Sequence, residues 1–313
     1  MSRIHEALKK AEQERATLQG GAASGFPVTE EAETGPAASL EERIPAAAAP
    51  ANPGRYPVSP ALGGPFNSDT LLSRCPQVAW KADATTMLFL NGNDTAPGTE
   101  EFRTLRSRLY HLREKKPLRK LLVTSALPQE GKSFTAANLA QVMVRQHGRR
   151  ALLIDADLRG PRLHQMLGTT SSPGLSDYLQ GQNDEFSIMQ RGPLENLFFI
   201  PSGNAIKDPS ELIGNGRLQQ LLQRLEPLFD WIILDSPPAV PVSDASVLAN
   251  ACDGVLMVVR SNATPSDAAR RAVQEFPEES LVGIVLNGTS GGDARYARYY
   301  YEAYETGTKT VKA

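Results

Sequence analysis

Residues 121–133 read Leu-Leu-Val-Thr-Ser-Ala-Leu-Pro-Gln-Glu-Gly-Lys-Ser. The apolar start of this stretch predicts a β-strand, Pro128 and Gly131 predict a turn, and the following residues, 134–146, predict a helix. A helix N-terminus offers unpaired N–H groups and the positive end of the helix dipole, and both favour anions. The stretch therefore predicts a strand, a phosphate-binding loop and a helix.

The loop follows the pattern G-x-x-x-x-G-K-[ST] at Gly131, Lys132 and Ser133, but Ala126 occupies the first glycine position. In loops of this pattern the lysine reaches the β- and γ-phosphates of a nucleotide, and the hydroxyl binds Mg²⁺. The Cβ of Ala126 requires a negative φ, so we expect a loop of slightly different shape. Gly-Lys-Ser also occurs by chance in turns, but the flanking strand and helix favour a nucleotide site.

The composition excludes several classes of protein. The chain has 313 residues and a net charge of -2, so no overall positive field favours nucleic acid, and we expect no such partner. Cys75 and Cys252 lack metal-ligand spacing, which suits a reducing cytosol. No apolar run approaches the roughly 20 residues of a membrane span, and residues 1–16 lack the apolar core of a secretory signal. We therefore expect a soluble cytoplasmic protein.

The composition also divides the chain into four parts. We expect an amphipathic helix over residues 1–18, a flexible Ala/Pro-rich linker over 19–85, a P-loop domain over 86–292 and a tyrosine-rich tail over 293–313. The linker composition cannot bury enough apolar surface to offset the entropy of ordering. The first helix either packs or frays, or it is a docking peptide for a partner, because isolated helices of this length are marginal.

Apolar runs alternate with helical patterns after the phosphate loop. The expected strands are residues 151–154, 197–200, 231–234, 254–259 and 281–286. The expected helices are residues 162–167, 175–179, 209–225, 243–250 and 266–276. This alternation predicts an α/β fold with a doubly wound, mostly parallel sheet of the P-loop NTPase type, in which ligands bind beyond the carboxyl ends of the strands.

Three aspartates follow expected strands. Asp155 and Asp157 stand two residues apart, so they project on the same side, where one could hold a metal-bound water and the other could accept a proton. Asp235 has the position of the acid that organises Mg²⁺ in P-loop enzymes. A turn aspartate would explain any one of them. All three, in one sheet with a Gly-Lys-Ser loop, predict a Mg²⁺-nucleotide site.

Three segments, 125–133, 152–164 and 232–238, carry a family resemblance. They resemble the Walker A, Walker A′ and Walker B motifs of the bacterial tyrosine kinases, specifically the cytoplasmic CpsD/CapB-like family of capsule and exopolysaccharide loci. Residues 173–177 and 208–212 and Asp244 are supporting matches. The resemblance covers about residues 100–287, and the combination is more specific than any single motif.

The resemblance implies an ATP- and Mg²⁺-dependent protein-tyrosine autokinase. The implied catalytic residues are Lys132, Asp155, Asp157 and Asp235, and the base among Asp155 and Asp157 stays open. The implied nucleotide-binding residues are Gln129, Glu130, Gly131, Lys132, Ser133, Phe134 and, at the end of the last strand, Asn287. The implied metal ligands are Ser133, Asp155 and Asp235. The departures, Ala126 and Gln129, where many members have glycine, remove no charge from the site.

Glu100, Arg103 and Arg106 fall on one side of a helix expected over residues 99–109. A solvated charged face is the commonest outcome for such residues. The alternative is a subunit contact, in which the arginine forks pair with carboxylates of a neighbour. The three residues match the E-x-x-R-x-x-R oligomerisation motif of the resembling family, which implies a homo-oligomeric ring.

The tail concentrates tyrosines in a way that packing explains poorly. Five lie close together, and three consecutive ones cannot all face one side of a helix. They are Tyr296, Tyr299, Tyr300, Tyr301 and Tyr304. A sticky terminal segment or an interface patch is one interpretation. The resemblance implies instead that they are phosphoacceptors of a neighbouring subunit, and each phosphate would add between one and two negative charges.

The resemblance further implies partners and a setting. These are a separate transmembrane polysaccharide co-polymerase as activator, a cognate tyrosine phosphatase, and a peripheral position at the inner face of the membrane, with polysaccharide chain length or export as the output. The alternative is a partitioning or division-site ATPase acting as a dimerisation switch, but those proteins usually carry a lysine five residues before the loop lysine, where this chain has Leu127. A scaffold that binds ATP only to assemble is a third possibility.

Overall fold

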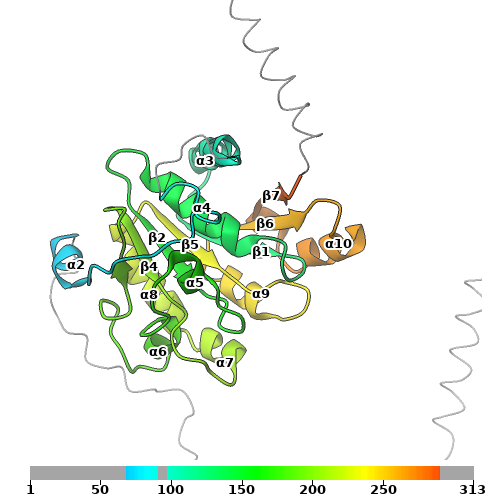
Figure 1. Ribbon diagram of the computed structural model, residues 1–313. Helices are drawn as coiled ribbons and strands as arrows, with labels where there is room; N and C mark the ends of the chain where they lie inside the picture. Colours follow the sequence, from blue (N-terminus) through cyan, green and yellow to red (C-terminus); the bar gives the residue numbers. More distant parts are fainter. Residues whose placement is uncertain (1–67, 91–96, 290–313) are drawn as a thin grey trace, which may run out of the picture. The chain divides into compact units, whose positions relative to one another are not determined.

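A seven-stranded sheet forms the centre of the part of the chain that the computed structural model describes, residues 68–90 and 97–289 (Figure 1). The strand order is β3-β4-β2-β5-β1-β6-β7, and every neighbouring pair is parallel except β3 with β4. The strands are β1 (Lys120–Ser125), β2 (Ala151–Asp155), β3 (Gln190–Arg191), β4 (Leu197–Ile200), β5 (Trp231–Asp235), β6 (Gly254–Arg260) and β7 (Leu281–Asn287). The expected doubly wound fold is confirmed, although β3 was not predicted.

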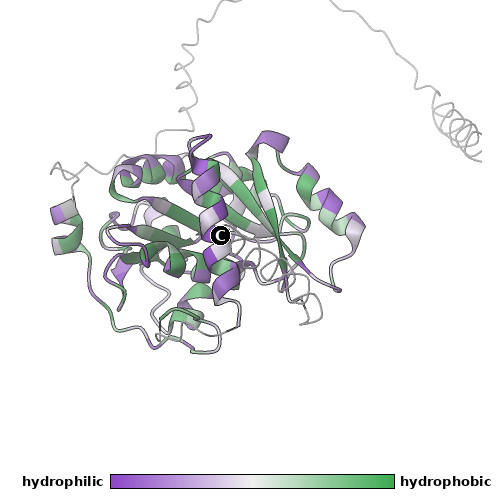
Figure 2. Ribbon diagram, turned by 90° about the horizontal axis from the view of Figure 1, so that it is seen from above, coloured by the Kyte–Doolittle hydropathy of each residue, from purple (hydrophilic) through white to green (hydrophobic). Residues whose placement is uncertain are grey.

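The central strands form where the sequence has continuous apolar runs. Every residue of β2, β4 and β5 is buried, as expected for parallel strands with helices on both faces. Figure 2 shows the same arrangement from above, with hydrophobic strands between helices whose outer sides are hydrophilic. The alternation of side chains along each strand therefore divides the interior into two cores.

One core lies under α3 (Thr99–Arg113), α4 (Lys132–Val144) and α5 (Leu163–Leu167), and it receives Leu121 and Val123 from β1. The other core receives Leu122 from the same strand and lies under the helices from α6 onward. These are α6 (Leu175–Leu179), α7 (Pro209–Gly214), α8 (Arg217–Leu225), α9 (Asp244–Ala249) and α10 (Ser266–Gln274). Short 3₁₀ turns, η1 (Glu226–Leu228) and η2 (Glu278–Ser280), precede β5 and β7.

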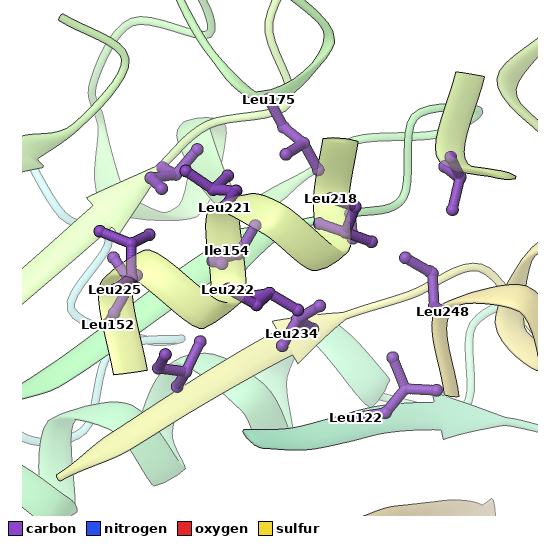
Figure 3. Packing of buried hydrophobic residues seen from close by; sticks show 14 of the residues in the cluster. Leu122, Leu152, Ile154, Leu175, Leu218, Leu221, Leu222, Leu225, Leu234 and Leu248 are labelled. Carbon is purple, nitrogen blue, oxygen red and sulfur yellow. The ribbon is translucent and has the colours of Figure 1, made fainter. Parts of the chain in front are cut away.

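Helix α8 is an example of how buried leucines pack a helix against the sheet. Its buried residues, Leu218, Leu221, Leu222 and Leu225, recur at helical spacing and pack over β2 and β5 (Figure 3). The single helix expected over residues 209–225 is wrong, because the chain breaks between α7 and α8 at Gly216, whose φ is 82°. That left-handed conformation cannot continue a helix.

The segment before α3 belongs to the folded part. Helix α2 (Ser68–Arg74) places Leu71 in one core, and Trp80 and Met87 are buried in the other. The side-chain oxygen of Asn138 on α4 accepts the Leu88 N–H at 2.8 Å. The linker boundary expected at residue 85 is therefore wrong, since the folded part already includes Ser68. The expected N-terminal helix, the linker up to residue 67 and the tail from 293 lie outside the described residues.

Within residues 68–90 and 97–289, no helix has the length and apolarity that crossing a membrane requires.

Candidate active site

Strand register brings the predicted acids to one edge of the sheet. Asp155 is the direct partner of Asp235 across β2 and β5, and Asp235 is in turn the partner of Val123 on β1. The phosphate loop follows β1, so it leaves the sheet next to both carboxylates. The site therefore lies at the carboxyl ends of the three central strands.

Lys132 is the centre of the charge cluster. Its Nζ lies 2.7 Å from Oδ2 of Asp157 and 3.7 Å from Oδ1 of Asp235, and it donates to Ser133 Oγ at 3.3 Å. Burial opposes the positive charge, but Asp235 and Asp157 outweigh it and raise the pKa of the lysine above its usual value. The structure thus brings together Lys132 and the acids predicted around it, with the ammonium held at the start of α4.

Two carboxylates of the site are fully buried and incompletely paired. Asp155 Oδ2 accepts the N–H of Leu163 at 3.1 Å, and its Oδ1 has no hydrogen-bond partner among the described residues. The Asp235 carboxylate has only loose contacts with Lys132, whose Nζ is 3.7 Å from its Oδ1, and with Ser133. Burial, together with the charge of Asp235, raises the pKa of Asp155 well above its usual range. Burial also raises the pKa of Asp235 to about 6, even though Lys132 favours its ionised form. Such oxygens are costly unless a ligand occupies them.

These oxygens fit the magnesium ion that the sequence predicts. Hard oxygen donors are what Mg²⁺ prefers, and it is usually held by one or two carboxylates plus phosphate and water. Among the described side chains, no group of three or more His, Cys, Asp or Glu residues could hold a metal ion.

The phosphate loop is shaped by two left-handed residues, Gln129 with φ 65° and Gly131 with φ 95°. Left-handed residues in a turn direct successive N–H groups into a concavity that binds anions. A Cβ at Gly131 would lie 2.0 Å from Asn287 Nδ2, and the φ of 95° strains any residue other than glycine, so both observations favour glycine there. Positive φ at non-glycine positions of the described chain occurs at Gln129 and Asn262 alone, so Ala126 has the negative φ expected from its Cβ.

Three residues predicted to bind nucleotide have other contacts in the structure. The Glu130 carboxylate is buried and accepts the N–H of Leu127 at 2.9 Å. Asn287 Nδ2 donates to the backbone oxygen of Glu130 at 2.9 Å. The Phe134 ring packs 5.9 Å from the Phe102 ring on α3, measured between centroids. Their proposed contacts with a nucleotide remain predictions.

An ion pair beside the site, between the exposed Arg159 and the buried Asp244, was not predicted as functional. Arg159 Nε donates to Asp244 Oδ2 at 2.7 Å and its second nitrogen donates to Oδ1 at 3.0 Å. Ser210 Oγ donates to the same Oδ1 at 2.6 Å. Burial opposes ionisation of Asp244, but the bonds from Arg159 and Ser210 lower its pKa below the usual value. The pair ties the loop after β2, which carries Asp157, to α7 and α9.

The predicted oligomerisation residues lie on α3. Arg103 forms an ion pair with Glu100 within the helix, and the Glu100 side chain remains 67% exposed. Arg106 donates to the backbone oxygen of Val142 at 3.0 Å, near the end of α4. A contact of these residues with a second subunit remains a prediction.

Comparison with known proteins finds tyrosine-protein kinases among the relatives of this chain. Residues 130–274 match the family model described as an AAA domain. Tyrosine-protein kinase YwqD of Bacillus subtilis is 33% identical over 192 residues, which cover 61% of this chain and 81% of that protein. Tyrosine-protein kinase CpsD of Streptococcus agalactiae is 33% identical over 179 residues, 56% of this chain and 77% of its own length.

A longer relative and two solved structures are also similar to this chain. Tyrosine-protein kinase wzc of Salmonella typhimurium is 31% identical over 70% of this chain, which spans only 31% of that protein. The kinase domain of Escherichia coli tyrosine kinase ETK has a TM-score of 0.59 and 31% identity, covering 63% of this chain and 78% of its own. The chimerical protein CapA2B2 has a TM-score of 0.60 and 27% identity, covering 70% and 96%. The chain belongs to the family of bacterial tyrosine-protein kinases.

Proposed function

We propose that this protein transfers the γ-phosphoryl group of ATP to tyrosines of its own C-terminal segment. The observation that carries the proposal is the placement of the Lys132 ammonium group at the start of α4, between the carboxylates of Asp157 and Asp235. A lysine in this position reaches the phosphates of a nucleotide bound at the helix N-terminus.

The charge of the site explains why a metal ion is needed. The carboxyl groups of Asp155, Asp157 and Asp235 outnumber the one ammonium group of Lys132, so the site needs further positive charge before it can hold a polyphosphate. When bound, Mg²⁺ would neutralise phosphate charge, and Ser133 and Asp235 would hold it. Lys132 would exchange a carboxylate partner for phosphate oxygens.

Proton transfer needs a base, and two carboxylates compete for this role. Both oxygens of Asp157 are engaged, one by Lys132 and one by the Gly160 N–H at 2.9 Å. Asp155 keeps one oxygen without a partner among the described residues, and its raised pKa makes its ionised form the stronger proton acceptor. We therefore assign the base to Asp155 and the orientation of Lys132 to Asp157.

The step balances with these roles. The tyrosine oxygen forms a bond to the γ-phosphorus, the bond from that phosphorus to the bridging oxygen of ADP breaks, and Asp155 receives the phenolic proton. Lys132 stabilises the charge that develops on the departing ADP. Such transfer depends mainly on positioning and electrostatics, which suits a site built from fixed strand ends.

The acceptors lie outside the described residues, but the route toward them begins at the site. Strand β7 ends at Asn287, whose side chain contacts the phosphate loop, so the chain leaves the sheet beside it. Tyr296 to Tyr304 begin nine residues later. As partners we propose a separate transmembrane activator, a second copy of the chain joined through α3, and a tyrosine phosphatase. The proposed output is control of exopolysaccharide chain length or export.

Purified protein incubated with ATP and Mg²⁺ tests this function. ADP release and total phosphotyrosine are measured for the wild type, for Lys132→Met, and for Lys120→Met, which removes a paired lysine at the far end of β1. We expect phosphotyrosine in the wild type and Lys120→Met and none in Lys132→Met. ADP release without phosphotyrosine would instead favour an ATPase switch, and ATP binding without either product would favour a scaffold.

A further inference from the structure

We propose that Thr264, acting through Glu130, is a positioning residue that holds the phosphate loop in its nucleotide-binding shape. The inference rests on the proposed ATP site. Thr264 follows β6 and is 134 residues from Glu130 in the sequence, yet its hydroxyl donates to Glu130 Oε1. Nothing in the nucleotide motifs includes it.

Contacts from the last two strands converge on two consecutive loop residues. A guanidinium nitrogen of Arg260 donates to the backbone oxygen of Gln129 at 3.1 Å. Asn287 Nδ2 donates to the backbone oxygen of Glu130 at 2.9 Å. The Thr264 hydroxyl is itself fixed, because it accepts the N–H of Arg260 at 3.0 Å. The loop is therefore held from one side by β6, β7 and the residues after β6.

Peptide geometry shows what these contacts accomplish. In a planar trans peptide, the C=O of one residue and the N–H of the next point in opposite directions. Holding the oxygens of Gln129 and Glu130 toward β6 and β7 therefore turns the N–H groups of Glu130 and Gly131 the other way. Within the described chain, neither N–H donates to a protein acceptor, so both are available to an anion.

The Glu130 carboxylate links Thr264 to the start of the phosphate loop. It is 3% exposed, and its two oxygens accept the N–H of Leu127 and the hydroxyl of Thr264. Bonds to an ionised group are stronger than neutral ones, and a buried carboxylate that loses a donor becomes costly. Removing the Thr264 hydroxyl therefore favours loop shapes in which Glu130 turns to solvent, and these shapes misdirect the N–H groups.

The test compares Thr264→Val, which removes the hydroxyl at nearly constant volume, with Thr264→Ser, which retains it. Thr85→Val is the matched control, because the Thr85 hydroxyl also donates to a carboxylate, Asp83, at an exposed site. We expect Thr264→Val to raise the KM for ATP about tenfold and to change kcat less than about threefold, because the loop holds phosphates in both ground and transition states. Thr264→Ser and Thr85→Val should remain within about twofold of the wild type.

Hydrogen exchange of the nucleotide-free protein gives a second readout. Thr264→Val should speed exchange of the Leu127 amide at least fivefold, whereas Thr264→Ser should not. A Thr264→Val protein with wild-type KM and wild-type exchange would overturn the positioning role. A wild-type protein that does not bind ATP would overturn the proposed function itself, so the two failures are distinguishable.

Discussion

Asp155 and Asp235 are direct register partners at the carboxyl ends of β2 and β5, and both are fully buried. Burial raises the pKa of Asp235 from the ordinary value of 3.8 to about 6 in the folded protein. Between these two pH values, the folded protein therefore keeps a proton on Asp235 that the unfolded chain has released. Stability from this proton is present below pH 4 and is lost as the pH rises through about 6.

Asp235→Asn should therefore flatten the dependence of stability on pH. We expect the free energy of unfolding of the nucleotide-free wild type to fall between pH 4 and pH 6.5 and that of the variant to fall less, because its buried amide does not ionise. Urea titrations across this range measure both slopes. Asp267→Asn, at an exposed site on α10, is the control and should keep the wild-type slope. Equal slopes in wild type and Asp235→Asn would contradict the burial of an ionisable group at this position.

Magnesium should bind firmly only together with nucleotide. The described side chains form no complete metal cluster, so Mg²⁺ alone at millimolar concentration should shift the Tm by less than about 1 °C. Mg²⁺ with ATP should raise the Tm by several degrees, and EDTA should remove most of that gain. Differential scanning fluorimetry makes the comparison. A large shift from Mg²⁺ alone would indicate a preformed metal site instead.

Gly131→Ala should weaken ATP binding strongly without unfolding the protein. The new Cβ would approach Asn287 Nδ2 to 2.0 Å in a residue with φ 95°, so the Asn287 side chain must move and the strained backbone costs about 1–3 kcal/mol. We expect affinity for ATP to fall more than about tenfold, as measured by calorimetry. Gly214→Ala in α7 is the control, since a Cβ there meets no described atom within 4 Å. Wild-type affinity in Gly131→Ala would mean that ATP selects another loop shape.

The Arg159–Asp244 pair should affect catalysis through the position of Asp157. Arg159→Lys keeps the charge but loses the bidentate hydrogen bonding to Asp244, so we expect kcat to fall about tenfold. The control is Arg224→Lys on helix α8. It changes the ion pair between Arg224 and Glu185 and should leave kcat unchanged. Steady-state rates of ADP release compare the two. A rate of Arg159→Lys equal to that of the wild type would show that the Arg159–Asp244 pair does not orient the loop after β2.

Local sequence pattern predicted every strand of the sheet except β3, and it predicted the acids at the strand ends. Continuous apolar runs end at Asp155 and Asp235, and parallel strands bring such ends to one edge, so the meeting of these acids near Lys132 follows from the pattern. The break at Gly216 was missed because one left-handed glycine interrupts an otherwise helical pattern. The buried Trp80 was missed because it stands in a region without periodicity.

The other residues that were not predicted make contacts between positions far apart in the sequence. Thr264 and Arg260 touch the phosphate loop across 134 and 131 positions of sequence, and no motif or spacing connects them to it. Arg159 and Asp244 lie near recognised motifs, but only the folded chain shows that they pair. Spatial neighbours of this kind carry no local signal.

Mapping of phosphotyrosine by mass spectrometry tests the central claim most directly. Wild-type protein and Lys132→Met are purified from their own cells, and the variant is also mixed with wild type, ATP and Mg²⁺. We predict phosphate on Tyr296 to Tyr304 in the wild type, none on Lys132→Met alone, and phosphate on the variant's tail once wild type is added. An unmodified wild-type tail, in cells that contain the proposed membrane activator and with ATP hydrolysed, would contradict the autokinase account.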